Sequence, residues 1–157
     1  MFYTFTFLKP DAIRRGLTTE ILLRFLRQGF RIELFSHEIV TENRIFAHYE
    51  HKIEEEGTIF KEKATNTFLN RSIIPVVWGG NDSKIITTIR KLIGATCPTK
   101  ADNGTIRGDL GVDSMEQSII EVRCCENLVH ASDSIESYYF EMELWFGKEI
   151  AEEYRCY

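Results

Sequence analysis

The residue of this 157-residue sequence with the clearest chemical potential is His130, in the run Glu126-Asn-Leu-Val-His-Ala-Ser-Asp-Ser134. A neutral imidazole is a competent nucleophile near pH 7, because its unperturbed pKa is about 6.5. The apolar residues before His130 predict a short strand, and the hydroxyls and carboxylate after it predict a helix start. Helix N-termini favour phosphate through free N–H groups and partial positive charge. The run therefore suggests a histidine that accepts a phosphoryl group; the alternative is a buried histidine satisfied by a carbonyl.

A second set of residues could bind phosphate. Arg90 lies near the end of an expected helix, Thr96 follows it, and the run Gly104-Thr-Ile-Arg-Gly-Asp109 lies further on. Guanidinium groups match phosphate oxygens, and Lys9 at the end of the first expected strand adds a compact positive charge. Structural explanations stay open, because Arg90 can interact with a helix dipole, Thr96 can form a turn and Lys9 can lie at the surface. The sequence has neither a Walker A loop nor a G-x-G-x-x-G run, so any nucleotide would need another architecture.

The elements that must position these residues alternate along the chain. Apolar and β-branched stretches predict strands at 2–8, 30–40, 73–78 and 128–130, and apolar periodicity predicts helices at 18–28, 41–56, 59–68, 83–93 and 134–146. Thr18 and Thr41 are expected to cap their helices. Pro75 is unusual inside a strand, because proline belongs on an edge strand or at a bulge. The segment from 95 to about 126 is expected to be irregular. This order favours an α+β sandwich with helices over a mainly antiparallel sheet.

Composition limits the classes of partner. A hydrophobic content of 43% in 157 residues fits one domain with its own core. The formal charge of −5 disfavours binding to nucleic acid through phosphate neutralisation. The four cysteines form no C-x-x-C pair, which excludes a zinc knuckle and a thioredoxin motif. The first eight residues lack the features of a signal peptide and are too short to span a bilayer, so we expect a cytoplasmic protein without a membrane partner.

Four short blocks, in order along the chain, resemble nucleoside diphosphate kinases. These blocks are Leu8-Lys-Pro-Asp11, Gly104-Thr-Ile-Arg-Gly-Asp109, Asn127-Leu-Val-His-Ala-Ser-Asp-Ser134 and Leu144-Trp-Phe146. The resemblance runs from about residue 3 to residue 147. It implies a ferredoxin-like fold, with a four-stranded antiparallel sheet covered by helices, in a single domain over 1–157. It also implies a Mg²⁺-dependent ping-pong reaction, in which His130 takes the γ-phosphate from ATP or another nucleoside triphosphate and passes it to a nucleoside diphosphate.

The resemblance assigns a role to each matching position. His130 matches the phosphorylated histidine, and Glu141 matches the carboxylate that holds the far ring nitrogen. Ser132 and Asp133 match residues near the phosphate and its Mg²⁺, with Asp133 acting on the metal indirectly. The aromatic position on which the base stacks is matched by Phe60, which implies broad base specificity because every base has a π-face. The positions that contact phosphate and sugar are matched by Lys9, Tyr49, Arg90, Thr96, Arg107 and Asn127.

The sequence departs from the family pattern in the loop after Arg107. The stretch before Asn127 is about ten residues longer than usual, which gives an extended loop at about 108–126, and a short extension covers 147–157. Ala131 replaces the commoner glycine after the histidine. A homo-oligomer is expected from the resemblance, although the insertion makes a hexamer doubtful. Two other hypotheses stay open: a weakly active scaffold, which would need none of the charged residues, and a nucleic-acid-binding protein, which the net charge disfavours.

Overall fold

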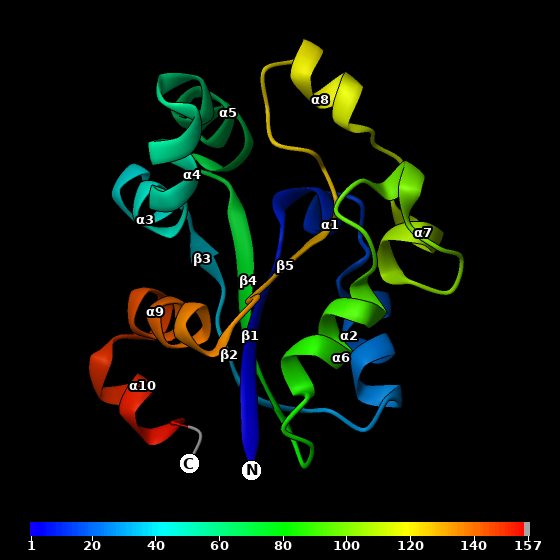
Figure 1. Ribbon diagram of the computed structural model, residues 1–157, viewed down its shortest axis with the longest axis vertical. Coiled ribbons are helices and arrows are strands. Elements are labelled where there is room, and N and C mark those ends of the chain that lie inside the picture. Colours follow the sequence, from blue (N-terminus) through cyan, green and yellow to red (C-terminus); the bar gives the residue numbers. More distant parts are fainter. Residues whose placement is uncertain (156–157) are drawn as a thin grey trace.

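The computed structural model describes residues 1–155, and its centre is an antiparallel sheet (Figure 1). Four strands lie in the order β2-β4-β1-β5, and the two-residue β3 pairs with β4 beyond the end of β2. The strands are β1 (Phe2–Leu8), β2 (Arg31–Phe35), β3 (Glu38–Ile39), β4 (Ser72–Gly80) and β5 (Val129–Ala131). This is the order of a ferredoxin-like sheet, so the expected fold class is confirmed with one additional short strand.

Helices cover both faces of the sheet because alternate strand residues point to opposite sides. Phe5 and Phe7 face a core shared with α3, α5, α9 and α10, whereas Leu8 and Trp78 face a core shared with α2 and α6. The helices are α1 (Pro10–Arg14), α2 (Thr18–Arg27), α3 (Glu42–His48), α4 (Glu50–Glu56), α5 (Thr58–Phe68), α6 (Ile85–Ile93), the 3₁₀ helix η1 (Pro98–Lys100), α7 (Ile106–Leu110), α8 (Met115–Ile120), α9 (Ile135–Phe146) and α10 (Lys148–Glu153). In the described part of the chain, no helix is long and apolar enough to cross a membrane.

The strand expected at 30–40 is divided in two, and Pro75 explains where. The N–H of Ser36 donates to the carbonyl of Pro75 at 3.1 Å. In an extended strand the nitrogen and carbonyl of one residue face the same neighbour, so the missing N–H of Pro75 faces the junction of β2 and β3. Proline is tolerated inside β4 because its partner strand is interrupted at that point.

Several expected boundaries were wrong, mostly around short helices. The segment from 95 to about 126 is not irregular, because it holds η1, α7 and α8, and α1 and α10 were not expected. These helices have three to six residues, too few to show an amphipathic period. Thr18 is the first residue of α2 and does not cap it, since the cap position is held by Leu17. The Thr41 cap is confirmed, because its hydroxyl accepts from the N–H of Arg44.

Candidate active site

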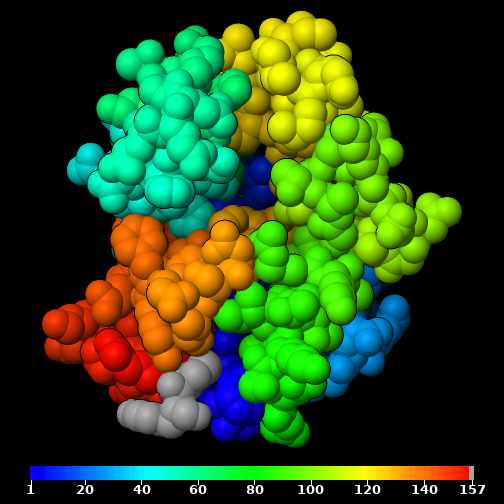
Figure 2. All heavy atoms as spheres, in the orientation of Figure 1, coloured from blue at the N-terminus to red at the C-terminus, as the bar shows by residue number. Residues whose placement is uncertain are grey.

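A cavity of about 980 Å³ opens between α4 and α5 on one side and α8 and α7 on the other, above β5 and α9 (Figure 2). The structure brings together almost all of the residues that the sequence singled out. Those that line the cavity are Lys9, Tyr49, Phe60, Arg90, Thr96, Arg107, Asn127, His130, Asp133 and Glu141. Ser132 is the exception, because it is 1% exposed and lies beneath the cavity.

His130 is carried by β5, and the Leu8-Lys-Pro-Asp11 block fixes that strand. Leu128 adopts a positive φ of 74°, a conformation that is strained for a side chain of its kind. The carboxylate of Asp11 accepts its N–H at 3.0 Å, and the N–H of Lys9 donates to its carbonyl at 2.8 Å. Phe7, opposite His130 in β1, stacks on the imidazole with ring centroids 4.8 Å apart. The position of the imidazole is therefore set by the sheet and by the first helix turn after β1.

Glu141 holds one nitrogen of the His130 ring and leaves the other free. Its Oε1 lies 2.6 Å from Nε2 of His130, and the hydroxyl of Ser132 donates to its Oε2. Because a carboxylate only accepts, Nε2 carries the proton and Nδ1 keeps its lone pair. Glu141 is 5% exposed, whereas the side chain of His130 is 22% exposed to the cavity. This is the arrangement that nucleophilic attack by Nδ1 requires.

The helix that carries Glu141 begins at a well-formed cap. The hydroxyl of Ser134 accepts from the N–H of Ser137, whose own hydroxyl accepts from the N–H of Ser134. The predicted cap directly after His130 is thereby confirmed. Asp133 accepts a hydrogen bond from the Ser137 hydroxyl, which is the main cause of its lowered pKa, so a carboxylate stands at the cavity edge.

Arg107 is held by the backbone around the cavity. It donates to three carbonyl groups, those of Asn127 at 3.0 Å, Gly94 at 3.1 Å and Val129 at 2.6 Å. Burial, and then the positive charge of Arg90, lower its pKa to about 10. Arg107 nevertheless stays charged near neutral pH, and two like charges side by side create a place that an anion would stabilise.

The loop that presents Arg107 depends on Gly108. The hydroxyl of Thr105 caps α7 by accepting the N–H of Gly108, and Asp109 accepts the N–H of Gly104 at 2.8 Å. A Cβ on Gly108 would lie 2.0 Å from the carbonyl oxygen of Asp102, which is well inside contact distance. The Gly-Thr-Ile-Arg-Gly-Asp run is thus a compact turn that only glycine permits.

Lys9 and Asn127 form a buried pair at the back of the cavity. The ammonium of Lys9 donates to the Cys125 carbonyl at 2.6 Å and to Oδ1 of Asn127 at 2.9 Å. The Asn127 amide in turn donates to the carbonyl of Thr96 at 2.8 Å. Burial lowers the Lys9 pKa, because few charges compensate the loss of water. An anion in the cavity would restore that compensation.

Tyr49 and Phe60 form the aromatic side of the cavity. Their ring centroids are 5.4 Å apart, and that of Tyr49 is 6.4 Å from His130. Burial raises the pKa of Tyr49 well above its ordinary value, so its hydroxyl stays neutral and can donate. Phe60 is only 8% exposed, so it offers part of its ring to the cavity.

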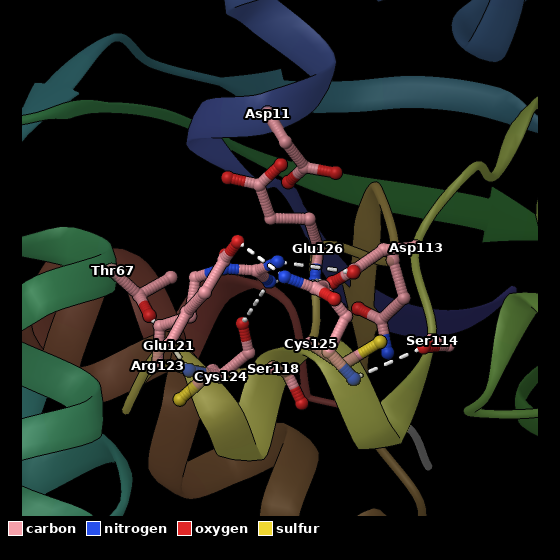
Figure 3. Close-up of polar contacts among 12 residues, drawn as sticks. Asp11, Thr67, Asp113, Ser114, Ser118, Glu121, Arg123, Cys124, Cys125 and Glu126 are labelled. Carbon is pink, nitrogen blue, oxygen red and sulfur yellow. Dashed lines mark hydrogen bonds and ion pairs between the residues drawn. The ribbon is translucent and has the colours of Figure 1, made fainter.

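Residues 113–125 form the facing side of the cavity, which we call the α8 wall (Figure 3). Arg123 forms a two-pronged ion pair with Asp113, at 2.5 and 3.0 Å. The N–H of Cys124 donates to the hydroxyl of Thr67 in α5, at 2.9 Å. Val122 has a φ of 50°, which is strained for a β-branched residue. Much of the loop expected at about 108–126 is therefore a folded wall of the cavity.

His48 is a site residue that the sequence reasoning missed. Its ring is edge-on to that of His130, with centroids 4.4 Å apart, and its Nε2 is 3.9 Å from Oε1 of Glu141. The only sign of His48 in the sequence was that it directly precedes Tyr49, a residue already assigned to the site. Within the described chain, His48, His130 and Glu141 form a trio of metal-ligand types. Trp145, however, donates its indole N–H to Nδ1 of His48 at 3.3 Å, which places the proton on Nε2 and removes the lone pair that a metal would need.

Comparisons with known proteins agree with this geometry. A family model described as nucleoside diphosphate kinase matches residues 3–150. A relative named nucleoside diphosphate kinase 1, from Saccharum officinarum, is 36% identical over 149 residues, which cover 95% of this chain and 90% of that protein. A nucleoside diphosphate kinase from Methanosphaera stadtmanae is 38% identical over 145 residues, 92% of this chain and 86% of that protein. A solved transition-state mimic of nucleoside-diphosphate kinase from Borrelia burgdorferi, with bound vanadate and ADP, matches with a TM-score of 0.86 and 30% identity over 94% of this chain and 88% of that one.

Proposed function

The chain belongs to the nucleoside diphosphate kinase family, and from that premise we propose that it moves the γ-phosphate of ATP or another nucleoside triphosphate to a nucleoside diphosphate through His130. The observation that carries this proposal is the pairing of His130 Nε2 with Glu141 at 2.6 Å, which leaves Nδ1 as the free nucleophile at the cavity. When one nucleophile serves both half-reactions, the enzyme alternates between a free and a phosphorylated form of that single residue.

The proposed reaction has two mirror-image halves. In the first, the Nδ1 lone pair of His130 forms a bond to the γ-phosphorus, and the bond from that phosphorus to the β,γ-bridging oxygen breaks. The bond electrons leave with the nucleoside diphosphate. In the second, a terminal oxygen of another diphosphate attacks the phosphohistidine, and the N–P electrons return to Nδ1. Glu141 stabilises the positive charge that develops on the ring, and Ser132 keeps Glu141 in place.

The cations around the cavity would stabilise charge on the transferred phosphoryl group. Lys9, Arg90 and Arg107 all line the cavity that contains His130. Electrostatic positioning of this kind supplies most of the catalysis in phosphoryl transfer. Tyr49 would donate a hydrogen bond near the phosphate, and Thr96 and Asn127 would contact phosphate and sugar. Stacking on the part of Phe60 that faces the cavity would make base specificity broad.

We propose that Mg²⁺ accompanies the nucleotide. Asp133 is a carboxylate that lines the cavity near His130, whereas Lys9, Arg90 and Arg107, which line the same cavity, are cationic. This donor set fits an ion that is held mainly by substrate phosphates and reached by Asp133 through water, which is how Mg²⁺ often binds. Such an ion would neutralise phosphate charge when bound. Asp133 would orient its water shell.

We further propose a homo-oligomer formed along β2. This strand is at the edge of the sheet, and edge strands readily pair with a second chain. Phe35 at its end is 73% exposed, and Ile39 in β3 is 53% exposed. We also propose that residues 1–157 act as one domain in the cytoplasm, without specific nucleic-acid binding. The three cysteines that the structure describes are free, which suits a reducing compartment.

Labelling with γ-³²P-ATP and Mg²⁺ tests the proposed function. The protein should acquire acid-labile, base-stable phosphate, which added GDP discharges. His130→Ala should abolish labelling, whereas His37→Ala, at an exposed histidine between β2 and β3 and outside the cavity, should label like the wild type. Equal labelling of His130→Ala would contradict the proposal.

A further inference from the structure

A second imidazole lies beneath the first, and it points at the same carboxylate. His48 ends α3, and its side chain is 1% exposed. Its Nε2 is 3.9 Å from Oε1 of Glu141, the same oxygen that lies 2.6 Å from Nε2 of His130. A separation of 3.9 Å is too long for a hydrogen bond, so in this structure the N–H acts as a dipole near the carboxylate. Such contacts often tighten when substrate binds.

Trp145 fixes which nitrogen of His48 carries the proton. An indole N–H can only donate, and it donates to Nδ1 of His48 at 3.3 Å. In a neutral ring the proton must then be on Nε2, the nitrogen nearer Glu141. The opposite tautomer would place a lone pair against the Glu141 oxygen and leave the indole N–H without its acceptor.

His48 is also kept uncharged. Burial is the larger cause of a pKa well below the ordinary value, and the nearby His130 lowers it further. Phe7 packs against the ring on one side, with centroids 5.1 Å apart, and Tyr49 lies edge-on at 4.6 Å. A cationic His48 would attract Glu141 away from His130. A neutral His48 directs its N–H toward the Glu141 carboxylate without neutralising the negative charge of that group.

We propose that His48 is a positioning residue for phosphoryl transfer. It acts by holding Glu141 in place, and Trp145 sets the tautomer of the His48 ring. This inference rests on the proposed role of His130. In the transfer, the His130 ring gains positive charge as Nδ1 bonds to phosphorus, and Glu141 must stay ionised and aimed at Nε2. His48 directs its Nε2–H toward Oε1 of Glu141, the oxygen that also accepts from His130. Ser132 donates to the other oxygen, Oε2.

Kinetics of three variants test the proposal. His48→Phe keeps the ring volume and removes the donor, and kcat should fall about tenfold with KM for nucleotide within about twofold, as expected for one lost polar contact to a charged group. His48→Gln can accept from Trp145 and donate to Glu141, so it should recover most of kcat. Trp145→Phe should lower kcat less than His48→Phe does, and the double variant should be no worse than His48→Phe alone. Wild-type kcat in His48→Phe, no recovery in His48→Gln, or additive losses in the double variant would overturn the proposal.

Nitrogen NMR reports the tautomer of the His48 ring, which a purely structural role for His48 would not require. Long-range ¹H–¹⁵N spectra at pH 7 should show His48 with its proton on Nε2, and Trp145→Phe should populate both tautomers. A proton on Nδ1 in the wild type would overturn the proposal. The experiments are run beside the wild-type labelling test. If the wild type does not label at His130, the proposed function fails; if it labels and the His48 variants behave like the wild type, only the positioning role fails.

Discussion

Two sides of the cavity differ in how they are built. The floor (Lys9, Arg107, His130 and Glu141) is held by strands β1 and β5, by α9 and by buried hydrogen bonds to main-chain carbonyls. The α8 wall is held by the ion pair of Asp113 with Arg123 and by hydrogen bonds to α5 and Lys9, and it includes a turn at a strained residue. The floor is therefore expected to be rigid and to determine the rate of transfer. The wall is expected to open more easily and to affect nucleotide affinity.

The largest effect should come from the floor. Glu141→Gln removes the charge opposite Nε2 of His130, and an amide can present either a donor or an acceptor to that nitrogen. We expect kcat to fall about 10²-fold, because a single positioned acid or base group typically contributes at least that much to the rate. Initial rates with ATP and GDP measure this change. Glu143→Gln, at an exposed position of α9, is the matched control and should keep its activity; equal rates in the two variants would argue against the charge role.

A smaller effect should follow from loosening the wall. Burial alone would raise the pKa of Asp113, but hydrogen bonds from Arg123 and from the N–H of Glu126 outweigh it and lower the pKa to about 2. A folded-state pKa below the unfolded value means that Asp113 stabilises the protein above about pH 4 and that this contribution is lost as the pH falls towards 2. Hydrogen exchange should show α8 opening in that window ahead of β1 and β4.

The corresponding substitution tests the same contact at neutral pH. Asp113→Asn should lower the free energy of unfolding by about 1–2 kcal/mol, because Arg123 loses one of its two charged partners and keeps the more exposed one, Glu121. KM for nucleotide should rise more than kcat falls. Denaturant unfolding and initial rates measure both quantities, with Asp102→Asn, an exposed position between η1 and α7, as the control. A fall in kcat with unchanged KM would show that the wall and the floor act as one unit.

The smallest effect is expected at the strained turn of the wall. Val122→Gly should raise the free energy of unfolding by about 0.5–1 kcal/mol, because glycine adopts a positive φ without steric cost. The reverse sign in denaturant unfolding would show that the Val122 side chain makes contacts worth more than the strain.

Sequence reasoning could predict Lys9, Arg107 and His130 of the floor because these residues lie in short blocks with strong local meaning, whereas Glu141 was assigned by the family resemblance. The cap after His130 follows from local chemistry, and the class of fold follows from the order of the expected strands and helices. The wall was harder, since α8 has only six residues and is held by an ion pair between Asp113 and Arg123, ten residues apart, that no local pattern indicates. Ser114 and Gln117, a cap and its partner, were the one local sign of the helix. His48 was missed because its role depends on Trp145, 97 residues away along the chain.

The position of His130 on an edge strand has a further consequence. The outward carbonyls of β5 are those of Val129 and Ala131, and they accept hydrogen bonds from Arg107 at 2.6 Å and Arg90 at 3.2 Å. Exposed edges invite strand addition and aggregation, so these two arginines also shield the sheet from uncontrolled polymerisation. Removing both would leave a bare β edge beside the nucleophile, and such a protein should form insoluble aggregates as well as lose its anion site.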